Sequence, residues 1–303
     1  MPRISRITMA LLLVMGAASV RLSSRLMASS DENGGAAEGP AQRATLHPVA
    51  APSPDIPFSN YDPQGERVLL NLANQARAQA GLHSLTLDAG LCQAARAHAQ
   101  EMVAAHQLSH RFDGELPLPQ RLADTTKALL DQEGENVALD SDAASGHRHL
   151  MLSPPHRANL LNASYNVIGL GVIRSGGRLY IVQDFGHALP NYSAAQVKER
   201  IAATVTQARR QAKQSGLARR DLPNADDAAC SMAQADKLGI SPIHQLAQRY
   251  TVLTYTSLQP ETLPANAGRA LSSHNLRSFS VGACYARTQT YPTGVYWVVL
   301  ALD

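Results

Sequence analysis

Two runs rich in β-branched residues constrain the fold of this 303-residue chain more than any other feature. They cover residues 167–173 and 179–185, and Ser175-Gly176-Gly177 lies between them. Because branched side chains favour strands and a glycine pair suits a tight turn, the pattern predicts two adjacent antiparallel strands. Apolar residues at helical spacing precede this hairpin, which indicates an α+β fold.

The two predicted helices before the hairpin have defined faces and ends. The first ends at Gly81, and the second begins after Asp88, a residue suited to capping a helix. The inward faces consist of Leu69, Leu72, Ala73 and Ala76 in the first helix and of Leu91, Ala95, His98, Ala99 and Met102 in the second. We interpret His98 as a core imidazole with a backbone hydrogen bond rather than as a ligand.

The same order of elements recurs after Pro190. A helical stripe over residues 197–212, a second helix near residues 228–235, and strands at 279–287 and 295–302 repeat the plan in fewer residues. We predict a shortened, diverged second copy of the first module, with Cys92 and Cys230 at corresponding places. Chance similarity between two helix-plus-hairpin segments is the alternative.

The N-terminal residues resemble a secretory signal. Arg3 and Arg6 precede an apolar stretch over residues 7–20, and small residues up to Ala28 offer cleavage sites. A buried helix or a single-pass anchor is the alternative. We therefore predict a signal peptide at 1–28, a disordered linker at 29–60, a first domain at 61–190 and the diverged copy at 191–303. The expected location is secreted or periplasmic, with no membrane span in the mature chain.

Charge and cysteine content exclude two classes of protein. The leader's four arginines exceed the formal charge of +3, so cleavage leaves −1, which gives no electrostatic footprint for nucleic acid. Three cysteines are too few for the disulfide framework of a small secreted domain. Cys92 is expected to be a buried thiol, whereas Cys230 and Cys284 could form a disulfide in the second copy.

Three motifs carry the chemistry. They are Leu108-Ser109-His110, Gly134-Glu135-Asn136 and a segment at 153–161 that contains His156, and the hairpin after them ends in Gln183-Asp184-Phe185-Gly186. Two imidazoles and a carboxylate that converge in one cleft could hold a metal ion or transfer protons. Spacing alone leaves their convergence open.

The order and flanks of these motifs resemble the CAP superfamily of cysteine-rich secretory, antigen 5 and pathogenesis-related proteins, most closely its bacterial extracellular SCP-like branch. The resemblance covers residues 61–189. It implies an α/β/α sandwich with a mainly antiparallel central sheet, and a cleft lined by two histidines and two glutamates. His110, Glu135 and His156 match three of these positions, but residues 144–147, where the resemblance places the second glutamate, hold no carboxylate.

The roles of the three matched residues stay open at this point. His110 and His156 are candidate ligands of a divalent metal such as zinc, with Glu135 nearby, and His147 could fill the vacant position. Alternatively, Glu135 caps a helix or pairs locally, and both histidines bond only to backbone. His106 could also share a helical face with His110, although Leu108-Ser109-His110 is expected at a helix end.

Three functions fit the sequence. The first is a secreted, non-catalytic module that binds a lipid, envelope or protein ligand in the His/Glu cleft. The second is a metal-assisted, protease-like hydrolase in which His110 and His156 hold the ion and Glu135 is the general base. The third is a scaffold of tandem copies. The chain has no GxSxG motif. Where the first copy has residues 153–161, the second copy offers only Ser272-Ser273-His274-Asn275-Leu276, a single histidine without a carboxylate partner, which indicates a structural or binding role.

Overall fold

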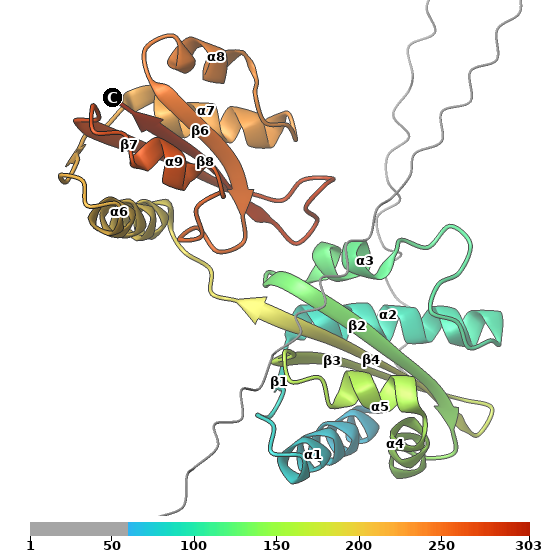
Figure 1. The fold of residues 1–303 in the computed structure, drawn as a ribbon. Coiled ribbons are helices and arrows are strands. Elements are labelled where there is room, and N and C mark those ends of the chain that lie inside the picture. Colours follow the sequence, from blue (N-terminus) through green and yellow to red (C-terminus); the bar gives the residue numbers. More distant parts are fainter. Residues whose placement is uncertain (1–59) are drawn as a thin grey trace, which may run out of the picture. The chain divides into compact units, whose positions relative to one another are not determined.

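The computed structural model describes residues 60–303 and contains two four-stranded sheets with helices on both faces of each (Figure 1). The predicted signal peptide and residues 29–59 of the predicted linker lie outside the described residues. No helix within residues 60–303 is long and apolar enough to cross a membrane. The fold class is the predicted mixture of helices and mainly antiparallel sheet.

The first sheet has the strand order β1-β3-β4-β2. Its strands are β1 (Thr86–Leu87), β2 (Leu129–Asp140), β3 (Val167–Ser175) and β4 (Arg178–Leu189). Strand β1 is parallel to β3, whereas the other pairs are antiparallel. The predicted hairpin is confirmed, because Ser175 pairs with Arg178 and both intervening glycines have positive φ.

Two helical layers cover the first sheet. Helices α2 (Ala89–Ala105) and α3 (Leu118–Thr125) lie on one face, and α1 (Pro63–Gln79), α4 (Ala143–Leu152) and α5 (Pro154–Leu160) on the other (Figure 1). Asp88 caps α2 by accepting a hydrogen bond from the Leu91 amide, and the predicted inward face of α2 is buried. A Cβ atom on Gly169 would lie 2.1 Å from the Leu91 carbonyl carbon, so this glycine lets α2 approach β3.

A buried arginine holds α1 to the far end of this module, which sequence periodicity did not reveal. Arg77 is fully buried, and its Nε donates to the His83 carbonyl at 2.8 Å. Its Nη1 and Nη2 donate to the carbonyls of Leu160, Asn162 and Tyr165 at 2.9 to 3.0 Å. The guanidinium therefore satisfies the carbonyl groups that follow α5.

The second sheet repeats this strand order as β5-β7-β8-β6. Its strands are β5 (Ala218–Arg219), β6 (Thr251–Ser257), β7 (Ser278–Ala286) and β8 (Val295–Leu302), and β5 is again parallel to its neighbour. Helices α6 (Ala194–Gln211) and α9 (Ala267–Leu271) cover one face, and α7 (Pro223–Gln234) and α8 (Ser241–Ala247) the other. The two sheets thus share a topology, while their origin by duplication stays a prediction, as do the domain boundaries.

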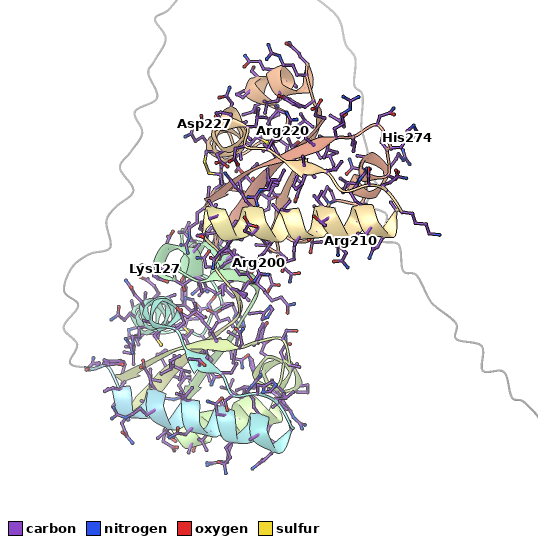
Figure 2. The ribbon with its side chains drawn as sticks, turned by 90° about the vertical axis from the view of Figure 1, so that its left-hand side faces the viewer. Lys127, Arg200, Arg210, Arg220, Asp227 and His274 are labelled. Carbon is purple, nitrogen blue, oxygen red and sulfur yellow. A yellow bond between two sulfur atoms is a disulfide. The ribbon has the colours of Figure 1, made fainter. Side chains whose placement is uncertain are left out.

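A second buried arginine lies in α6, the long helix that Figure 2 shows with Arg210 near its C-terminal end. Arg209 is fully buried, and its Nε donates to the Ser215 carbonyl at 2.9 Å. Its Nη1 donates to Leu271 and Ser273 at 2.7 and 2.6 Å. Arg209 therefore occupies the same structural position as Arg77.

The cysteines confirm one prediction and correct another. Cys230 and Cys284 form a disulfide between α7 and β7 with a Cα separation of 5.1 Å, and Cys92 is a buried free thiol, as predicted. The predicted correspondence of Cys92 with Cys230 is wrong. Cys92 lies four residues after the cap of α2 at Asp88, whereas Cys230 lies eight after the cap of α7 at Leu222, about one helical turn further along.

Candidate functional site

Three different elements carry the three predicted site residues. His110 lies in the loop between α2 and α3, Glu135 on β2, and His156 on α5. Helix α2 ends with His106 in a left-handed conformation, so His110 lies beyond the helix as predicted and shares no helical face with His106. On the sheet, Glu135 pairs directly with Asp184 of β4.

The Glu135 carboxylate is held at both oxygens. Oε1 lies 2.8 Å from Nδ1 of His110, and Oε2 accepts a hydrogen bond from Nη2 of Arg121 at 2.7 Å. Burial opposes ionisation of Glu135, but the His110 hydrogen bond and the Arg121 charge together lower its pKa. Glu135 and His110 are therefore joined across 25 residues, and the alternative of a local Glu135 pair and backbone-bonded histidine is wrong for this pair.

His110 is the accessible member of this pair. Its side chain is 59% exposed, whereas that of Glu135 is 4% exposed. The hydrogen bond to Glu135 raises the pKa of His110. The site therefore presents an imidazole with increased basicity to solvent, oriented from behind by a buried carboxylate.

A second carboxylate lies beneath the site, and sequence reasoning missed it. Glu115 Oε1 lies 2.6 Å from Nδ1 of His98 and 3.3 Å from Nη1 of Arg121. His98 is buried, and its Nε2 lies 2.8 Å from the Ser109 carbonyl oxygen, which confirms a core imidazole with a backbone partner. Arg121 thus lies between two glutamates, where its charge compensates for both.

Asp184 is the most deeply buried acid of the site. Neither of its carboxylate oxygens has a hydrogen-bond partner among residues 60–303. Burial and the neighbouring Glu135 charge raise the pKa of Asp184 well above its usual range. Burial therefore favours the neutral form of Asp184, whereas the ionised form of the neighbouring Glu135 is favoured.

Carboxamide side chains connect the sheet to His156. Asn136 Nδ2 donates to the His156 carbonyl at 3.0 Å and to Gln183 Oε1 at 3.2 Å. Asn159 Nδ2 donates in turn to Asn136 Oδ1 at 3.0 Å and to the Glu135 carbonyl at 3.1 Å. These bonds fix α5 against β2, and so they position His156 relative to Glu135.

His156 and His110 are near enough to influence each other. Burial, followed by the charge of His110, lowers the pKa of His156. One imidazole is thus favoured in its charged form and the other in its neutral form. A neutral imidazole is the form that binds metal ions.

A three-ligand metal centre does not fit these residues. The part of the chain that the structure describes contains no group of three or more His, Cys, Asp or Glu side chains arranged to hold an ion. Both Glu135 oxygens are already engaged by His110 and Arg121. The assignment of His110 and His156 as a pair of ligands stays a prediction.

The vacant acid position at residues 144–147 lies on α4, and the assignment of His147 to it stays a prediction. His147 lies on α4 and is buried, and its Nδ1 has no hydrogen-bond partner among the described residues. Burial lowers the pKa of His147. The carboxylates that accompany Glu135 are instead Glu115 and Asp184, one from a loop and one from the neighbouring strand.

A family comparison agrees with this architecture. Residues 70–185 match the model of the CAP family, described as the cysteine-rich secretory protein family. This part of the chain is a CAP domain. No curated protein matches the chain in sequence.

Solved structures of bacterial proteins are similar to the CAP domain. An extracellular SCP-domain protein from Bacillus anthracis is 26% identical over 41% of this chain and 40% of its own, with a TM-score of 0.38. An outer surface protein from Borrelia burgdorferi is 20% identical over 42% of this chain and 95% of its own, with a TM-score of 0.39. A cysteine-rich secretory protein from Staphylococcus aureus is 22% identical over 43% and 39%, with a TM-score of 0.34. The chain thus spans under half the length of the Bacillus and Staphylococcus proteins.

Proposed function

We propose that the CAP domain is a non-catalytic binding module that holds an anionic group of a lipid, envelope or protein ligand against His110 and His156. The observation that carries this proposal is the exposed imidazole of His110, whose Nδ1 is fixed by the buried Glu135 carboxylate. Because that bond raises the pKa of His110, it favours the charged form of the ring, which donates a charge-assisted hydrogen bond. A phosphate or carboxylate suits such a donor.

The same geometry argues against catalysis by the protein alone. A general base needs a free carboxylate or imidazole close to the proton that it removes, but Glu135 is engaged at both oxygens. Among residues 60–303, no Ser, Thr or Cys side chain forms a hydrogen bond with His110 or His156. The nearby Ser109 hydroxyl donates to the Arg111 carbonyl instead. The site therefore has no activated nucleophile.

Two other features support placing this function outside the cytoplasm. The Cys230–Cys284 disulfide is typical of oxidising compartments. The first residues have the pattern of a secretory signal. Fractionation of the native producer, with an antibody against residues 61–303, tests this location.

A titration followed by NMR tests the binding proposal. A soluble short-chain phosphatidylglycerol is added to the protein, and the imidazole signals of His110 and His156 are followed, with inorganic phosphate as a head-group control. We expect both signals to shift and a His110→Ala, His156→Ala double variant to lose the binding. His274→Ala, an exposed histidine outside the CAP domain, is the matched control. Equal binding by the double variant contradicts the proposal.

The metal-assisted hydrolase is the second candidate, and the neutral state favoured for His156 beside His110 is the observation in its favour. In that case the two imidazoles would hold the ion. Calorimetric titration with zinc alone, on the wild type and on the double variant, tests it. Zinc binding that depends on both histidines, together with zinc-dependent cleavage of casein, would replace the binding proposal with this one.

A further inference from the structure

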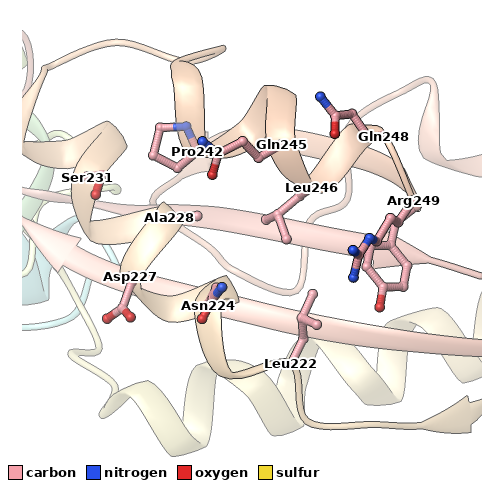
Figure 3. A pocket seen from close by; sticks show the side chains of 11 residues that line it. Leu222, Asn224, Asp227, Ala228, Ser231, Pro242, Gln245, Leu246, Gln248 and Arg249 are labelled. Carbon is pink, nitrogen blue, oxygen red and sulfur yellow. The ribbon is translucent and has the colours of Figure 1, made fainter.

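A cavity in the second module is lined by residues between 222 and 250 and shares no residue with the His110 site. It lies between α7 and α8 and has a volume of about 440 Å³ (Figure 3). Small-molecule sites usually measure about 300 to 1,000 Å³. This cavity, called the α7–α8 cavity below, is therefore large enough for a small ligand.

In the CAP domain, the two helices that follow the short parallel strand, α2 and α3, are closely packed. Two residues after the cap, α2 has Gly90, where a Cβ would lie 2.3 Å from the Thr126 Cα at the end of α3. The chain after α3 thus packs onto the α2 backbone.

In the second module, the two helices that follow the short parallel strand are α7 and α8, and the α7–α8 cavity lies between them. Asn224, two residues after the cap of α7, carries a carboxamide that lines this cavity.

The lining of the α7–α8 cavity has hydrogen-bonding capacity that the chain does not use. Its polar side chains are Asn224, Asp227 and Ser231 from α7, and Gln245, Gln248, Arg249 and Tyr250 from α8 and the residues after it. Among residues 60–303, none of these seven side chains forms a hydrogen bond or an ion pair. Carboxamides both donate and accept, so they complement the N–H and C=O groups of a peptide.

Apolar and charged groups have distinct places in the cavity. Leu246 reaches from α8 toward Ala228 and Leu222 on the α7 side, which gives the centre an apolar surface (Figure 3). Asp227 and Arg249 lie at opposite ends and form no ion pair with each other or with another described residue (Figure 3). The Asp227 carboxylate only accepts hydrogen bonds, and the Arg249 guanidinium only donates them.

We propose that the α7–α8 cavity binds a short peptide with free termini. Its ammonium group lies at Asp227 and its carboxylate at Arg249, where a guanidinium can bind bidentately. The amide groups between them face Asn224, Gln245 and Gln248, and small apolar side chains face Leu246. A neutral sugar would satisfy the carboxamides but would leave both charges without partners.

Calorimetric titration of the whole protein with trialanine tests this proposal. We expect saturable binding of the free tripeptide and binding at least about tenfold weaker when its carboxylate is amidated or its amine acetylated, since each change removes one charge-assisted contact. The neutral disaccharide N,N′-diacetylchitobiose is the competing probe. Tighter binding of the disaccharide, equal binding of the blocked peptide, or no binding of trialanine at millimolar concentration overturns the proposal.

Exposed, nearly isosteric substitutions assign the two ends. Arg249→Gln should weaken trialanine binding about tenfold but should not weaken binding of the amidated peptide further, because both changes remove the same contact. Asp227→Asn should behave likewise toward the acetylated peptide. Arg269→Gln and Asp124→Asn, exposed residues outside the cavity, should bind as the wild type does. If Arg249→Gln and amidation of the peptide instead weaken binding additively, Arg249 does not contact the carboxylate, and the assignment is overturned.

Discussion

The two sheets share a strand order but differ in the residues that pair across the strands in one central row. Equivalent hydrogen bonds align the two sheets. The Ile168 carbonyl in β3 accepts from the Asp88 amide just after β1 at 3.0 Å, and the Phe279 carbonyl in β7 accepts from the Arg220 amide just after β5 at 2.9 Å. The next row across the first sheet consists of Gly169, Asp184 and Glu135, and across the second sheet of Ser280, Ala301 and Val252. Acids in one sheet thus stand where apolar residues stand in the other.

This difference shows which interactions the topology needs. Burying an acid reduces stability unless it is well paired, and Asp184 has no hydrogen-bond partner among the described residues. The second sheet forms the same topology without that row. The buried acids of the CAP domain therefore serve its site, whereas Arg77 and Arg209, present in both modules, serve the fold.

The buried arginines should give the largest effect, and an equal one in both modules. Arg77→Met leaves buried carbonyls without donors, and we expect the free energy of unfolding to fall by about 4 kcal/mol. Arg209→Met should cause a similar loss in the second module. Denaturant unfolding with hydrogen exchange resolved by module measures both, and Arg67→Met, which is exposed, is the control. A loss under about 1 kcal/mol in either module would contradict an equal role for the two arginines.

The disulfide should distinguish the modules. Cys230→Ala with Cys284→Ala removes a link across 54 residues, and we expect the second module to lose about 3 kcal/mol. Exchange protection in the CAP domain should stay unchanged. Cys92→Ala provides the comparison, since it removes a thiol that links nothing. Equal loss of protection in both modules would mean that they unfold as one unit.

Glu135→Gln should destabilise the CAP domain by about 2 kcal/mol at neutral pH, because Arg121 loses a charged partner. The pKa of Glu135 is lowered in the folded state, so its contribution is present above its ordinary pKa of 4.5 and is lost as pH falls through the folded value. Unfolding at several pH values should show the difference from wild type shrinking in acid. Glu101→Gln, exposed on α2, is the control, and a constant difference would contradict the ion-pair account.

Asp184→Asn should have the smallest effect and the opposite sign. The folded-state pKa of Asp184 is raised, so the unfolded chain loses this proton first, and wild-type stability declines as pH rises above 3.8. The amide variant avoids that decline and should be more stable by at least about 1 kcal/mol at neutral pH. The two proteins should converge below pH 3.8. A variant that is less stable at neutral pH would show that the carboxylate is ionised and paired.

Local signals predicted most of the first module, and the reasons for the misses are physical. The hairpin, the face of α2 and its Asp88 cap depend on neighbours in sequence, so periodicity and turn chemistry were sufficient. Glu115 lies in an irregular loop, and Asp184 gains its role only from cross-strand register with Glu135. Because Arg77 is charged, the sequence alone predicts that it is exposed. Only long-range contacts identify these three.

The buried state of Cys92 also bears on oxidative folding. Three cysteines allow three different single disulfides, of which Cys230–Cys284 is the native one. Burial raises the pKa of the Cys92 thiol, and its sulfur lies 3.5 Å from the Leu170 amide inside the CAP domain. Since thiol exchange requires an accessible thiolate, folding of the CAP domain removes Cys92 from competition. Domains near the N-terminus fold first during synthesis, so the CAP domain buries Cys92 before the second module folds. Cys284 is then the one cysteine that remains available to Cys230.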